Sequence, residues 1–80
     1  PVPKVQAFLD AMAQTGTAPE FECFDLGIVC SVGLYVDVGM AKHPHYNFVT
    51  GVASGMPVDP ELLPFLLKYI KPGSRWEVTA

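Results

Sequence analysis

The sequence predicts an α/β fold in which short parallel strands alternate with helices. Three apolar and aromatic segments begin near Phe21, Tyr46 and Trp76, so successive starts lie about 25 and 30 residues apart. Each interval leaves room for a helix, and an amphipathic stretch precedes the first segment. This spacing is typical of repeating strand–helix units, both in an eight-unit barrel and in an open, doubly wound sheet. The spacing alone fits both architectures.

The first half of the chain predicts a helix, a strand and a second helix. A helix from Lys4 to Gln14 follows from an apolar face formed by Val5, Phe8, Leu9 and Met12. A strand is predicted over Phe21–Asp25. The valines and glycines of Ile28–Val38 favour a strand locally, but Asp25 is a suitable N-cap and Gly39 a suitable residue after a helix end. We therefore predict a helix there.

The second half predicts a strand, a loop, a helix and a third strand. The strand covers Tyr46–Val52. A helix is expected from Asp59 to about Ile70, because Asp caps a helix and the following proline fits its first turn. Pro64 inside this helix predicts a kink or a loose first turn. The third strand is predicted over Trp76–Ala80.

Composition indicates a segment of a larger structure. The 80 residues are 50% hydrophobic and 16% charged, with a net charge of −3. A free-standing domain of this size normally has more charge on its surface, so we expect residues 1–80 to be a single partial domain. The absence of a basic run argues against nucleic-acid binding. No apolar run approaches the ~20 residues that span a bilayer, so we expect no membrane partner and a cytoplasmic location.

Two cysteines, Cys23 and Cys30, are too few for the disulfide framework of a small secreted domain. We expect both to be reduced and buried among apolar neighbours. A redox or nucleophilic pair is the alternative.

Acidic residues on the first predicted strand are the main candidates for chemistry. Glu20 and Glu22 alternate with Phe21 and Cys23, so one strand face is apolar and the other acidic. If the apolar face packs against helices, Glu22 points to the inside of the sheet or barrel, where catalytic groups occur. A structural ion pair or a wet rim is the alternative for both glutamates. Asp25 is predicted to be a helix cap rather than a catalyst.

Two further motifs have possible ligand roles. His43-Pro44-His45 has a spacing found in zinc sites, but it precedes a strand, at the edge opposite the usual active-site edge. We predict exposed loop histidines. The loop Ser54-Gly55-Met56 lies before a predicted helix start, where backbone N–H groups can bind a phosphate or carboxylate. A tight connection without a ligand is the alternative.

Three blocks resemble the β-keto acid cleavage enzymes, the group that contains 3-keto-5-aminohexanoate cleavage enzyme. They are PEFECFDLG at Pro19–Gly27, YNFVTGVASGMP at Tyr46–Pro57 and WEVTA at Trp76–Ala80. Their order and spacing resemble those of the family over nearly the whole chain. The resemblance implies a fragment of a (β/α)8 TIM barrel, carrying approximately strands five to seven.

The resemblance also implies a function. Members exchange carbon–carbon bonds between a β-keto acid and acetyl-CoA, giving acetoacetate and a CoA thioester, with zinc as Lewis acid. The family's zinc ligands fall outside this segment, so no metal ligand is assigned here. Glu22 matches the family's active-site glutamate, and Ser54, Gly55 and Met56 are candidates for substrate binding. A homo-oligomer is expected, and the segment alone is expected to be inactive. The alternative is a small α/β association module without catalysis.

Overall fold

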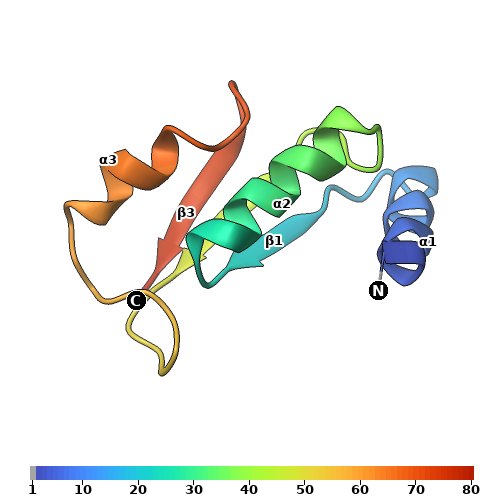
Figure 1. Ribbon diagram of the computed structural model, residues 1–80. Helices are drawn as coiled ribbons and strands as arrows, with labels where there is room; N and C mark the ends of the chain where they lie inside the picture. The colour runs from blue at the N-terminus through green and yellow to red at the C-terminus, as the bar shows by residue number, and fades with distance from the viewer. Residues whose placement is uncertain (1) are drawn as a thin grey trace.

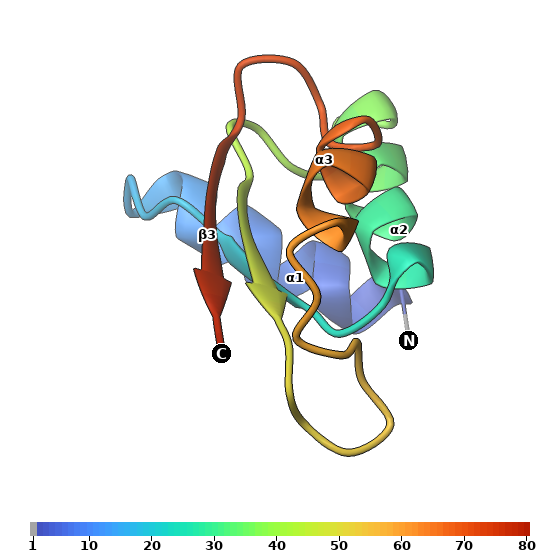
Figure 2. The ribbon, with the colours of Figure 1, turned by 90° about the vertical axis from the view of Figure 1, so that its left-hand side faces the viewer.

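The computed structural model describes residues 2–80 as a three-stranded parallel sheet with helices. The elements in chain order are α1 (Val2–Gln14), β1 (Glu20–Cys23), α2 (Leu26–Asp37), β2 (His45–Val49), α3 (Leu62–Leu67) and β3 (Arg75–Thr79). The strand order is β1-β2-β3. Helices α2 and α3 lie on the same face of the sheet (Figure 2), and α1 lies near the amino end of β1 (Figure 1). The predicted α/β alternation is confirmed, and it is consistent with a segment of a TIM barrel.

The strand register separates an apolar face from a polar one. Phe21 pairs with Tyr46, which pairs with Trp76, and the next row is Glu22, Asn47 and Glu77. Because neighbouring residues of a strand point to opposite faces, the first row lies on one face and the second on the other. The apolar face meets α2 and α3, while neither of these helices covers the polar face.

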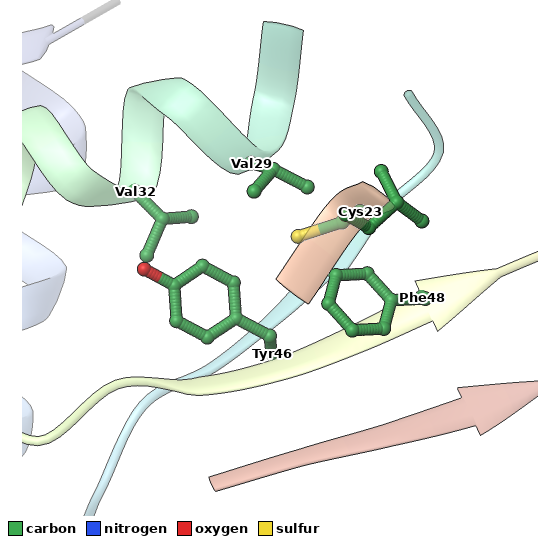
Figure 3. Close-up of a cluster of buried hydrophobic side chains, with 6 residues drawn as sticks. Cys23, Val29, Val32, Tyr46 and Phe48 are labelled. Carbon is green, nitrogen blue, oxygen red and sulfur yellow. The ribbon is translucent and has the colours of Figure 1, made fainter. Parts of the chain in front are cut away.

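The buried core lies between the apolar sheet face and helices α2 and α3. Its members are Cys23, Val29, Val32, Tyr46, Phe48 and Leu66, and most of them converge in Figure 3. The rings of Tyr46 and Phe48 stack with centroids 6.2 Å apart. The buried Tyr46 hydroxyl accepts a hydrogen bond from the Lys71 backbone N–H at 3.2 Å, so its polar atom is satisfied.

Besides its backbone hydrogen bond to Tyr46, Lys71 contacts helix α2 through its side chain. Its ammonium group pairs with Asp37 at the end of α2. Its aliphatic stem passes over Gly33, where an added Cβ would lie 3.5 Å from Lys71 Cε. One residue therefore contacts the sheet through its backbone and α2 through its side chain.

Helix α2 covers Leu26–Asp37, within two residues of the predicted span Ile28–Val38, and both predicted end signals are present. The Asp25 carboxylate accepts a hydrogen bond from the Ile28 N–H at 2.8 Å, and Gly39 follows the helix with a φ of 79°. These caps satisfy groups that the helix ends leave without partners. The helix reading of this stretch is confirmed over the strand reading, and Asp25 is a cap.

Helix α3 covers Leu62–Leu67, so it is shorter at both ends than the predicted span from Asp59 to about Ile70. Its amino end is a turn. The Asp59 carboxylate accepts from the Glu61 N–H at 3.0 Å, and the Leu62 N–H donates to the Asp59 carbonyl at 3.0 Å. The helix therefore begins at Leu62 instead of Asp59. Pro64 falls in the first turn, where its missing N–H removes no helical hydrogen bond.

Strand β2 also ends early, at Val49, because Gly51 takes a φ of 78° that an extended strand does not allow.

The apolar face of helix α1 is less covered than the sequence predicts. Leu9 is buried, but Phe8 is 73% exposed, so only part of the predicted apolar face is covered. Across the described residues, the helices are too short or too polar to traverse a bilayer.

The Asp25 cap predicts a measurable contribution to stability. Replacing Asp25 by Ala removes the acceptor for the Ile28 N–H and is expected to lower the free energy of unfolding by about 1 kcal/mol. Asp25→Asn keeps a capping oxygen and is the matched control. Chemical denaturation of the intact protein measures both, and equal losses in the two variants would contradict the capping role.

Candidate functional site

Polar side chains from all three strands gather on the sheet face that α2 and α3 leave open. Those described there are Glu20, Glu22, His45, Asn47, Arg75, Glu77 and Thr79. Every second residue of a strand points to the same face, and the parallel register places these residues side by side on the three strands. The polar face is therefore built from residues that lie far apart in the sequence.

Glu22 lies on this face, as the alternation of β1 predicts. It is exposed, and its register partner on β2 is Asn47. Within residues 2–80, no hydrogen bond or ion pair engages its carboxylate. The carboxylate is thus available to a ligand or to another part of the protein.

Asn47 is a functional candidate that the sequence analysis missed. It is a buried polar side chain of the central strand, and its Oδ1 accepts a hydrogen bond from Thr79 Oγ1 at 2.9 Å. The Thr79 carbonyl accepts in turn from the Thr50 N–H at 2.8 Å. These bonds fix the carboxyl ends of β2 and β3 beside Glu22. Only the strand register reveals this placement.

Glu20, His45 and Glu77 form a second polar cluster toward the amino ends of the strands. Nδ1 of His45 lies 3.7 Å from Glu20 Oε1, and Nε2 lies 3.6 Å from Glu77 Oε1. The pKa of the Glu20 carboxyl is raised above its ordinary value. The main cause is a hydrogen bond to Glu77, and the second is burial, which disfavours the charged form. Two carboxylates thus flank one imidazole.

The prediction of two exposed loop histidines is wrong for one of them. His43 is exposed, but His45 is the first residue of β2 and its side chain is only 22% exposed. Pairing of the His45 N–H with the Pro19 carbonyl extends the strand to this residue. Glu77, its second partner, was not singled out by the sequence.

This cluster has the donor set of a metal site. Glu20, His45 and Glu77 each offer one ligand atom, and these atoms lie within 4.8 Å of one another. One imidazole nitrogen and two carboxylate oxygens suit zinc and related divalent transition metals. Among residues 2–80, it is the only group of three side chains of these types close enough to hold one metal ion.

The loop after β2 folds back on itself beside the end of β1. The Gly51 N–H donates to the Met56 carbonyl at 2.8 Å and the Gly55 N–H to the Val52 carbonyl at 3.1 Å. A Cβ on Gly55 would meet Val52 Cγ2 at 2.9 Å and lie 3.6 Å from the Phe24 carbonyl oxygen. The loop therefore lies at the carboxyl edge of the sheet.

Of the predicted substrate-binding residues, Ser54 is exposed with a φ of 63°, while Met56 packs against the core. The expectation that this loop directly precedes a helix is wrong, because α3 begins at Leu62. Its Gly55 N–H is already hydrogen-bonded within the loop.

The two cysteines have different environments. Cys23 is fully buried, and burial raises the pKa of its thiol from 9.0 to about 11. Cys30 is exposed on α2, so the expectation that both are buried is wrong for Cys30. It lies on the helix side turned away from the core residues Val29 and Val32. A buried thiol with a raised pKa does not suit a nucleophile.

Thiol labelling tests this difference. In the intact protein at pH 8, a disulfide reagent is expected to modify Cys30 within minutes and Cys23 only after unfolding, because the thiolate is the reactive form. Peptide mapping identifies the labelled cysteine, and Cys30→Ser is the control that removes the fast phase. Fast labelling of Cys23 in the folded protein would contradict its burial.

One comparison with known proteins gives a match. The sequence model of the beta-keto acid cleavage enzymes matches residues 1–80. The chain belongs to this family. A search of curated proteins finds no match. Membership indicates an enzyme that cleaves β-keto acids, in a family that is generally metal-dependent.

Proposed function

We propose that the protein is a zinc-dependent enzyme of the 3-keto-5-aminohexanoate cleavage type. It exchanges a carbon–carbon bond between a β-keto acid and acetyl-CoA, giving acetoacetate and a new CoA thioester. Residues 1–80 are proposed to be the middle segment of a TIM barrel, approximately strands five to seven, in a cytoplasmic homo-oligomer. Family membership supports the reaction class, and the polar sheet face carries the proposal for the site.

The polar face favours a barrel over an open, doubly wound sheet. In a doubly wound sheet helices cover both faces, and strands buried on both faces are apolar throughout. Here one face carries Glu22, Asn47 and Glu77, which a second helix layer would bury without enough partners. In a barrel this face is the interior, whose carboxyl end opens to substrate.

Glu22 is the proposed catalytic residue. Its carboxylate is exposed on the polar face, near the carboxyl end of β1, and has no partner among the described residues. It is therefore suited to accept a proton from, or to orient, a β-keto acid held at that edge. The hydrogen bond between Thr79 and Asn47 joins the two neighbouring strands, and Asn47 is the register partner of Glu22.

When bound, zinc polarises the keto oxygen as a Lewis acid. Glu20, His45 and Glu77 fit a metal by donor type. Glu20 and His45 begin their strands, however, whereas substrate is proposed to bind at the carboxyl edge. The ligands of the catalytic zinc are therefore proposed to lie outside residues 1–80.

The Glu22 assignment predicts a loss of turnover. Glu22→Gln in the intact enzyme removes the proton acceptor and is expected to lower kcat by about 100-fold or more, with fold and zinc content retained. Glu61→Gln, an exposed glutamate before α3, is the matched control and should leave kcat unchanged. Steady-state kinetics of acetoacetate formation measure both, and wild-type kcat in Glu22→Gln would remove this residue from the mechanism.

Ser54, Gly55 and Met56 are proposed to border the substrate site, because their loop lies at the carboxyl edge beside the Phe24 carbonyl. Loss of one hydrogen bond in Ser54→Ala is expected to raise the KM for one substrate about fivefold with kcat retained. Ser74→Ala, before β3 at the opposite edge, is the control. An unchanged KM for both substrates would exclude a Ser54 contact.

A second candidate is a small association module without catalysis. Its supporting observation is that Phe8, Trp76 and Val78 are all more than two-fifths exposed. A defined complex without any β-keto acid turnover would favour this candidate, whereas turnover by the intact protein would favour the enzyme.

A further inference from the structure

Toward its amino edge, the polar face carries three metal-binding side chains, one from each of the three strands. Glu20 begins β1, His45 begins β2, and Glu77 lies in the middle of β3. Register brings Glu20 directly opposite His45, while Glu77 reaches His45 from the next row. Each side chain is thus held by a hydrogen-bonded strand, which is the rigid support that a metal site requires.

The spacing of the ligand atoms fits a single ion. Ligand atoms bound to tetrahedral zinc at about 2.0–2.1 Å are separated from one another by about 3.4 Å. Glu20 Oε1 lies 3.7 Å from Nδ1 of His45 and Glu77 Oε1 lies 3.6 Å from Nε2. One ion binds only one imidazole nitrogen, so these two distances do not belong to one ligand set. A set with one ligand atom from each residue lies within 4.8 Å, and side-chain rotation would have to shorten the longest of its separations for all three atoms to bind one ion.

The charge at this edge also favours a cation. Two carboxyl groups lie beside a single imidazole, so acidic groups outnumber basic ones within the cluster. Arg75, the register partner of His45, forms no ion pair with Glu20 or Glu77 among residues 2–80. The side chains of Glu20 and Glu77 are 46% and 49% exposed, so an ion can enter from solvent.

We propose that Glu20, His45 and Glu77 bind a divalent transition-metal ion, zinc by preference, at the amino edge of the sheet. Three protein ligands leave a fourth position for water. The ion would join all three strands, so its main effect would be on stability. This inference stands on the geometry of the cluster and does not depend on the proposed reaction.

Zinc binding by the intact protein tests the site. After removal of metal with a chelator, zinc is titrated into wild type, His45→Gln and His43→Gln, with bound zinc per chain measured by mass spectrometry and affinity by calorimetry. His45→Gln is expected to bind one zinc fewer per chain, or to bind it at least tenfold more weakly. His43→Gln alters an exposed histidine two residues away and should match wild type.

Thermal unfolding gives a second readout that needs no activity. Zinc should raise the Tm of wild type and His43→Gln more than that of His45→Gln, because an ion that binds only the folded state stabilises it. If circular dichroism shows that His45→Gln does not fold, Glu77→Gln takes its place with the same expected losses. The proposal would be overturned if the folded variant bound as much zinc as wild type, with the same affinity and the same zinc-dependent increase in Tm.

These outcomes separate this site from the proposed function. Loss of the zinc with β-keto acid cleavage retained would support the site and the reaction together. Loss of the zinc in a protein that shows no cleavage would support the site and contradict only the reaction.

Discussion

The parallel pairing of β2 with both of its neighbours determines the arrangement of every other part of the molecule. A single residue of slip along β2 would move Tyr46 and Phe48 to the open face and His45 and Asn47 beneath the helices. The native register instead puts two aromatic rings against α2 and α3. Burial of these rings stabilises the register, and the register in turn places every polar side chain of the opposite face.

The polar face has two regions with different chemistry. Toward the carboxyl edge, Asn47 and Thr79 satisfy one another and leave Glu22 unpaired. Toward the amino edge, Glu20 and Glu77 flank His45. An unpaired carboxylate suits proton transfer, whereas a cluster of paired ligand types suits an ion. The same sheet face therefore carries both the proposed catalytic residue and the proposed metal site.

Sequence reasoning succeeded where the determining contacts are local. The Asp25 cap and the alternation that places Glu22 depend on residues within one turn or one strand. It failed where contacts cross strands. Asn47 and Glu77 show no local signal, and the position of His45 depends on its pairing with Pro19 from the preceding strand region. Helix α3 was overestimated because Asp59 caps a turn as readily as a helix.

The connections at the two edges of the sheet differ in how firmly they are held, and Lys71 holds the one that leads into β3. Its backbone, stem and ammonium group contact Tyr46, Gly33 and Asp37, so the segment that leads into β3 is tied to both the sheet and α2. An insertion there would have to break all three contacts. The loop from Val52 to Met56 hydrogen-bonds mainly to itself, and within it Met56 packs against the core. Ala53 and Ser54 can therefore change at little cost to the core. The connection at the carboxyl edge thus tolerates sequence change more readily than the amino-edge segment that Lys71 holds.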